Sequence, residues 1–203
     1  MKTLIASLFS LFVLVSSVGA TEAPDALTQR VTAEVLTIIK SDKGLQSGDM
    51  RKLNELVDAK ILPHFNFGRM TALAVGQDWR AASPEQKTKI TAEFKTLLVR
   101  TYANALVSYK NQSIDVKPLK FAAGETDVTV KTEVKQSAGQ PIPIDYSMQF
   151  KDGGWKVYDV VVGGVSLVTN YRDEFRQTIR QGGIDGLLAL LVSKNNQPVA
   201  TKK

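Results

Sequence analysis

The sequence contains no cysteine and only one histidine, His64, in 203 residues. Without cysteine, a disulfide-stabilised scaffold and catalysis by a thiol are both excluded. A single imidazole lacks the companion ligands of a histidine-based metal site, so we expect no metal and a structural, hydrogen-bonded role for His64. These absences favour a binding protein over an enzyme, and we identify no catalytic residue.

Residues 1–20 have the pattern of a secretory signal peptide. Lys2 gives a positive start, residues 4–18 carry no charge, and Val18-Gly19-Ala20 offers small residues for cleavage. The segment is too short for a stable membrane span, which disfavours the alternative of a retained anchor. We therefore expect an exported chain that begins at Thr21.

The exported chain has a modest positive charge. The first 20 residues hold one of the 26 basic residues and none of the 20 acidic residues, so the remainder is positive by five. This charge favours an anionic membrane surface or an acidic partner. Nucleic acid fits the sign but not an exported protein, and the scattered charges are typical of a solvated surface. The length is sufficient for one core without cross-links.

Helical spacing of apolar residues dominates the first half of the exported chain. It predicts helices from Pro24 to Gly44, from Met50 to the residue before Pro63, and from Phe67 to Gly76. The sharpest local signal is the capping box at residues 83–86, with Pro84 at the first helical position. This helix should continue to about residue 109.

An alternating pattern then predicts strands over residues 128–134 and 142–150, with a further strand at residues 114–116. Asp152-Gly153 has the chemistry of a two-residue type I′ turn, which would fix the register of a hairpin. The expected pairs are Phe150 with Trp155, Met148 with Val157, Tyr146 with Asp159, and Ile144 with Val161.

The last part of the chain returns to helical spacing. Gly163-Gly164 should end the strand as a corner, and a helix should run from Val165 to Gly182-Gly183. A final helix should follow Asp185, with a flexible polar tail over residues 193–203. Helices segregated from an antiparallel meander predict the α+β class. A bent sheet crossed by a long helix would form a cone whose interior holds either side chains or a ligand.

Several segments carry a resemblance to a known family. They are Leu62-Pro63-His64-Phe65, Ala74-Val75-Gly76, Trp79-Arg80, Ser83-Pro84-Glu85-Gln86, residues 94–103, residues 155–172 and Gly183-Ile184-Asp185-Gly186-Leu187. In this order they resemble the MlaC family of periplasmic phospholipid-binding proteins, also called toluene-tolerance proteins. The family often has an acidic residue just before the Gly-Val-Ser step, where this chain has Gly163.

The resemblance implies an NTF2-like (cystatin-like) fold with an internal apolar cavity, formed by residues 21–192. It implies a periplasmic carrier of a diacyl phospholipid that moves between an outer-membrane lipoprotein complex and an inner-membrane ABC-type transporter complex. Such a carrier maintains the lipid asymmetry of the outer membrane. The phospholipid would be cargo rather than a cofactor, and we expect a monomer that binds no nucleic acid and is not an enzyme.

A soluble carrier must shelter acyl chains from water. About 30 methylenes at ~0.8 kcal/mol each amount to on the order of 24 kcal/mol, so the pocket should be dry and near the upper end of ~300–1,000 Å³. Each candidate lining residue also fits an ordinary core position, because periodicity does not distinguish a filled interior from a hollow one. The candidates are Phe94, Leu97, Leu98, Tyr102, Tyr146, Met148, Trp155, Val157, Val165, Leu167, Val168 and Tyr171.

Polar candidates are fewer. Arg80, Arg100 and Arg172 are possible neighbours of a lipid phosphate, although each also fits a solvated or ion-paired arginine. Asp159, beside Tyr146 in the expected register, is either a structural hydrogen-bond acceptor or the base of an NTF2-like small-molecule enzyme with a raised pKa. A third alternative is an adaptor protein whose core is simply full.

Overall fold

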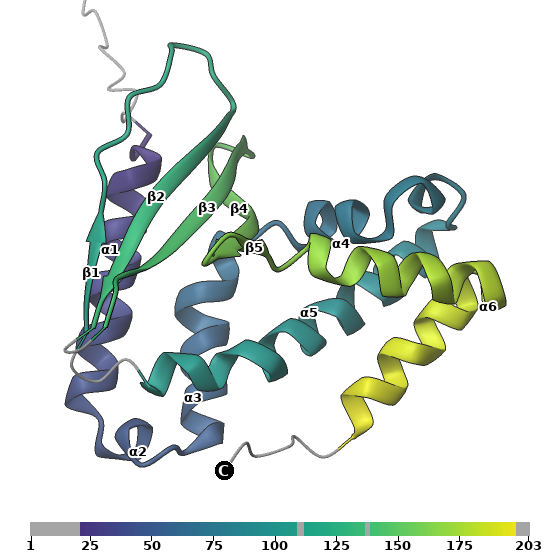
Figure 1. The fold of residues 1–203 in the computed structure, drawn as a ribbon, viewed down its shortest axis with the longest axis horizontal. Coiled ribbons are helices and arrows are strands. Elements are labelled where there is room, and N and C mark those ends of the chain that lie inside the picture. The colour runs from purple at the N-terminus through teal and green to yellow at the C-terminus, as the bar shows by residue number, and fades with distance from the viewer. Residues whose placement is uncertain (1–20, 109–111, 137–138, 198–203) are drawn as a thin grey trace, which may run out of the picture.

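The computed structural model describes residues 21–108, 112–136 and 139–197 (Figure 1). The predicted signal peptide therefore lies outside the described residues. The first helices are α1 (Pro24–Ser41), α2 (Lys43–Gln46), α3 (Met50–Leu56), α4 (Phe67–Val75) and α5 (Pro84–Ser108). Shorter turns are the π-helical η1 (Val57–Ile61) and the 3-10 helices η2 (Leu62–His64) and η3 (Gly76–Arg80).

One five-stranded antiparallel sheet follows these helices. The strands β1 (Ser113–Val116), β2 (Asp127–Lys135), β3 (Ile142–Lys151), β4 (Gly154–Val162) and β5 (Val165–Ser166) lie side by side in chain order, and α6 (Thr169–Asn196) ends the described fold. The predicted α+β class is confirmed. Among the described residues, no helix combines the length and the apolar character that crossing a bilayer requires.

Local sequence signals place most helix ends correctly. In the capping box, the Ser83 N–H donates to Gln86 Oε1 at 2.9 Å and the Gln86 N–H donates to Ser83 Oγ at 3.1 Å. Gly76 ends α4 with a φ of 75°. The helix predicted to reach Gly44 instead ends at Ser41, because Asp42 accepts the Gly44 N–H at 2.7 Å and thereby starts α2.

The β3–β4 hairpin confirms the predicted turn and half of the predicted register. Asp152 and Gly153 have φ values of 52° and 80°, as a type I′ turn requires. The pairs Phe150–Trp155 and Met148–Val157 are confirmed. The predicted pairs Tyr146–Asp159 and Ile144–Val161 are wrong, since Tyr146 lies opposite Val160 and Ile144 opposite Val162.

A β-bulge explains the change of register. The register shifts between Ser147 and Met148, so that Tyr158 on β4 has no partner on β3. One extra residue moves every following side chain of the bulged strand to the other face. Asp159 therefore leaves the apolar face that the straight register predicts for it, and Val160 takes its place.

Asp159 also sets the start of α6. Its Oδ1 accepts the Val168 N–H at 3.2 Å, and its Oδ2 accepts the Ser166 hydroxyl at 2.6 Å. Ser166 Oγ in turn accepts the Thr169 N–H at 3.0 Å. Val165 pairs with Val162 in β5, so the prediction of a helix from Val165 is wrong and the helix begins at Thr169.

The helix break predicted at Gly182-Gly183 appears as a kink inside α6. Gly183 has a φ of 65° and a ψ of −167°, a conformation that a side chain would strain. The helix then continues past the predicted boundary at Ser193. Asn195 is buried and donates to the Glu93 carbonyl at 2.9 Å, so residues 193–196 belong to the fold, while residues 198–203 lie outside the described part.

Two apolar interiors meet along α5, which extends from α6 to beneath the sheet (Figure 1). One interior, here named the α4–α6 core, is packed between α4, α5 and α6. Phe94 and Phe175 are fully buried there with ring centroids 5.2 Å apart, and Tyr171 meets Phe94 at the same spacing. The other interior lies between the sheet, α1, η1 and the second half of α5, and it is hollow.

Candidate functional site

The hollow interior is a partly enclosed cavity of about 390 Å³. This volume is in the lower part of the expected range rather than near its upper end. Its wall is almost wholly apolar, with Thr28, Thr32, His64, Tyr102 and Tyr146 as the polar exceptions. The apolar lining consists of Leu27, Val31, Val35, Leu36, Ile39, Val57, Ile61, Leu62, Phe65, Phe67, Met70, Leu98, Val99, Ala103, Ala105, Leu106, Ile114, Val134, Ile144, Met148, Val157, Val160, Val162 and Leu167.

The structure brings half of the predicted lining residues to this cavity. These are Leu98, Tyr102, Tyr146, Met148, Val157 and Leu167. They come from α5, from the inner face of β3 and β4, and from the approach to α6. Their contact with a lipid remains a prediction, but their shared position fits it.

The other half lies elsewhere. Phe94, Leu97, Val168 and Tyr171 belong to the α4–α6 core. Trp155 packs at the hairpin end, where its ring contacts Phe121 and Phe150 at centroid distances of 5.6 and 5.5 Å. Val165 is 56% exposed on β5. None of these six residues lines the cavity. Phe94 and Leu97 miss it because the apolar stripe of α5 faces two different interiors along its length.

Sequence reasoning missed the wall formed by α1 and η1. Val31 and Val35 of α1 face the cavity, and Ile61 lines it from η1. The helical spacing of these residues was visible in the sequence, but the same spacing describes a stripe packed against a filled core. No sequence signal distinguishes the two cases.

Two polar groups in the wall have shifted pKa values. Burial raises the pKa of Tyr102 to about 12, and the neighbouring Tyr171 hydroxyl, which is hydrogen-bonded to Tyr102, adds to this rise. Burial, followed by the positive charges of Lys156 and Arg30, lowers the pKa of His64. The His64 side chain makes no hydrogen bond to any described residue, so the hydrogen-bonded role predicted for it is not observed.

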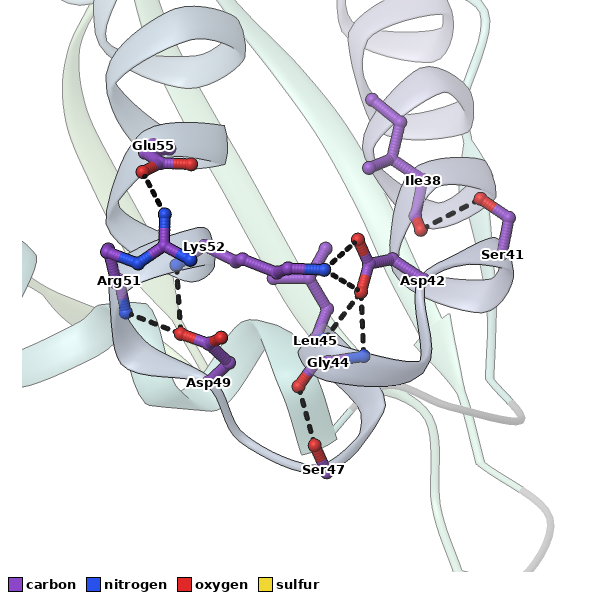
Figure 2. Close-up of polar contacts among 10 residues, drawn as sticks. All are labelled: Ile38, Ser41, Asp42, Gly44, Leu45, Ser47, Asp49, Arg51, Lys52 and Glu55. Carbon is purple, nitrogen blue, oxygen red and sulfur yellow. Dashed lines mark hydrogen bonds and ion pairs between the residues drawn. The ribbon is translucent and has the colours of Figure 1, made fainter.

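Polar contacts among residues 38–55 connect the C-terminal end of α1, which forms part of the cavity wall, to α2 and α3 (Figure 2). Asp42 caps α2 and accepts the Lys52 ammonium of α3 at 2.9 Å. The hydrogen bond from Lys52 is the main cause that lowers the pKa of Asp42. Asp49 caps α3 by accepting the Arg51 N–H at 3.0 Å. Farther along, Lys60 of η1 pairs with Glu34 of α1 at 2.5 Å.

Comparison with known proteins identifies the family. The family model of the MlaC protein matches residues 29–193. The chain belongs to the MlaC family. This confirms the resemblance carried by the sequence motifs.

Individual relatives of this MlaC-family chain agree. A phospholipid-binding protein from Ralstonia solanacearum, solved in complex with a phospholipid, is 39% identical and superimposes with a TM-score of 0.79, covering 87% of this chain and 97% of that one. The intermembrane phospholipid transport system binding protein MlaC of Haemophilus influenzae is 25% identical over 97% of this chain and 94% of its own. The toluene tolerance protein ttg2D of Pseudomonas putida is 28% identical over 82% and 77%, respectively.

The three arginines expected near a lipid phosphate do not line the cavity of this MlaC-family chain. Arg100 Nη2 donates to the Gln197 carbonyl at 2.5 Å and ties α5 to the end of α6. Arg172 Nε donates to the Leu73 carbonyl at 3.1 Å and ties α6 to α4. Arg80 is exposed at the end of η3. Two of the three therefore hold helices together.

The acid–base pair considered for an enzyme does not form in the cavity. Tyr146 lines the cavity, but Asp159 does not. The bulge at Tyr158 turns Asp159 toward Ser166 and Val168, where its carboxylate accepts the bonds that start α6. Over the described ranges, no group of three or more potential ligands among His, Cys, Asp and Glu is placed to hold a metal ion.

Proposed function

We propose that this protein binds a diacyl phospholipid in the cavity and carries it across the periplasm. The carrier would move between an outer-membrane lipoprotein complex and an inner-membrane ABC-type transporter complex, and so maintain the lipid asymmetry of the outer membrane. The observation that carries the proposal is the almost wholly apolar cavity in a chain whose 39% identical relative was solved with a phospholipid.

A carrier must give the acyl chains an environment as apolar as the one they leave in the bilayer. Exposing two acyl chains to water would require on the order of 24 kcal/mol, at ~0.8 kcal/mol per methylene. A bilayer offers similar shelter, so a carrier needs only a cavity of comparable apolarity. About 390 Å³ is small for two chains, and loading therefore requires the wall to adjust. Met70 and Met148 lie in that wall, and unbranched thioether side chains adapt readily to chains of different length.

The supporting features of the proposal follow from the sequence and the family. The signal-like residues 1–20 and the family support a periplasmic location. The bent sheet with its crossing helix suits an NTF2-like (cystatin-like) relationship. We infer a monomer that acts by binding rather than catalysis, with lipid as cargo and without a cofactor.

Native mass spectrometry of protein purified from the periplasm tests the proposal. We expect the mass of one phospholipid above that of the chain without residues 1–20, and the same lipid in an organic extract. Asp159→Asn should leave this loading unchanged, because Asp159 lies outside the cavity. A chain that carries no lipid, even after incubation with phospholipid vesicles, would favour the adaptor with a full interior. Turnover of a small carbonyl substrate that Asp159→Asn abolishes would favour an enzyme.

A further inference from the structure

The only histidine of the chain stands at the edge of the cavity where η2 meets β4. A parallel bridge between Phe65 and Val157 holds the two segments together. The Lys156 ammonium donates to the carbonyl of Pro63, the residue before His64, at 2.7 Å, and its positive charge acts on the His64 imidazole. His64 lines the cavity, and its imidazole has no hydrogen-bond partner among the described residues, so it can donate to a ligand.

Charged side chains surround this edge on the α1 side. Lys60 pairs with Glu34 at 2.5 Å, and Arg30 pairs with Glu22 at 2.8 Å. Both pairs are partly exposed, while Val31 and Val35 on the same stretch of α1 line the cavity. A charged rim therefore borders the apolar wall directly.

The rim has one cation more than its carboxylates neutralise. Arg30 and Lys60 each have an acidic partner, whereas Lys156 has no ion-pair partner in the described part of the chain and donates to a carbonyl. A lone ammonium beside an imidazole at the edge of an apolar cavity suits an anion whose remainder is apolar.

Building on the proposed function, we propose that the phosphodiester of the bound lipid lies against His64 and Lys156. Its oxygens would accept hydrogen bonds from the imidazole and the ammonium. The acyl chains would then descend past Ile61 and Val157 into the cavity. This site selects for a phosphodiester but leaves the rest of the headgroup in solvent.

The protonation of His64 would report such contact. Lys156 on β4 and Arg30 on α1 act together with burial to lower its pKa, while Glu22 and Glu34 on α1 oppose them. These effects favour the neutral imidazole, which carries one N–H. An adjacent phosphodiester anion stabilises the charged imidazolium, so binding of the lipid should raise the pKa of His64.

Because the chain contains only this histidine, labelled histidine gives one NMR signal to titrate in delipidated protein without a histidine tag. Loading with phosphatidylglycerol should raise the pKa of His64 by about 1 or more. Diacylglycerol with the same acyl chains should load without this rise. Lys156→Gln should reduce the rise, while Lys151→Gln, an exposed lysine at the turn of the same hairpin, should not.

The outcomes separate this inference from the proposed function. If native mass spectrometry shows bound phosphatidylglycerol and the pKa of His64 does not change, the headgroup site is wrong while the carrier function stands. If neither lipid binds, both proposals fail. If inorganic phosphate alone raises the pKa as much as phosphatidylglycerol does, the site is one for free phosphate and not for a lipid headgroup.

Discussion

The α4–α6 core and the cavity differ in what fills them, although one helix serves both. The first half of α5 places Ile90 and Phe94 in the α4–α6 core, where both are fully buried. The second half places Val99 and Ala103 in the cavity wall. On the filled side, aromatic rings from α5 and α6 meet edge to face. On the hollow side, most lining residues are aliphatic.

This difference shows that a continuous apolar stripe does not define one interior. Interiors of proteins are normally packed to the density of organic crystals, so an apolar hollow needs a ligand or a loss of stability to account for it. The α4–α6 core supplies packing that the cavity lacks. The filled side can thus hold the fold together while the other side stays available for cargo.

The largest expected difference between the two interiors is in the loss of stability caused by a matched pair of truncations. Ile90→Ala in the α4–α6 core should lower the free energy of unfolding by about 2–5 kcal/mol, because it opens a void among packed atoms. Ile61→Ala in the cavity wall removes the same atoms from a surface that already faces empty space, and should lower it by less than about 2 kcal/mol. Urea unfolding of delipidated protein measures both values. Equal losses would contradict the distinction between the two interiors.

A second pair tests the same distinction by adding volume. Leu98 borders both the cavity and the α4–α6 core, and in Leu98→Trp the added ring should enter the cavity and sharply reduce the lipid bound per chain. Val168→Trp overpacks the α4–α6 core and should lower the free energy of unfolding by about 1–3 kcal/mol, while folded molecules keep their lipid. Native mass spectrometry and urea unfolding give the two readouts. Unchanged loading in Leu98→Trp would remove this residue from the lipid site.

Acid should loosen the cavity side before the filled side. Hydrogen bonds from Arg30, Lys60 and Lys52 lower the pKa values of Glu22, Glu34 and Asp42, respectively. A carboxyl with a lowered folded-state pKa stabilises the fold above its ordinary pKa of about 4, and this contribution disappears as the pH falls through the lowered value.

Glu34 joins α1 to η1, and Asp42, which lies between α1 and α2, joins that link to α3. By contrast, Glu85, whose pKa is also lowered, pairs with Lys89 within α5. The effect is modest, because all of these groups are partly exposed. As the pH falls from 5 to 3, protection from hydrogen exchange, corrected for the intrinsic exchange rate, should therefore decrease in α1 and α3 earlier than in α6. Simultaneous loss of protection in all three helices would contradict this expectation.

The sequence predicts those features that depend on a few neighbouring residues. The capping box at Ser83, the stop at Gly76 and the turn at Asp152 each depend on local hydrogen bonds or on a positive φ, and all three are observed. The family also follows from the sequence, because its motifs occur in order along the chain. The register beyond Met148 was not predictable, since no local signal marks Tyr158 as the extra residue of a bulge.

By itself, the sequence determined the α+β class, the element order and the family. Periodicity, caps and motifs each depend on residues that are near one another in the chain. The tertiary structure alone decided which apolar residues surround space and which fill it. It also decided that His64 faces the cavity while Arg100 and Arg172 tie helices together. Burial and charge proximity depend on segments far apart in the chain, and no spacing along the sequence encodes which of two interiors a side chain enters.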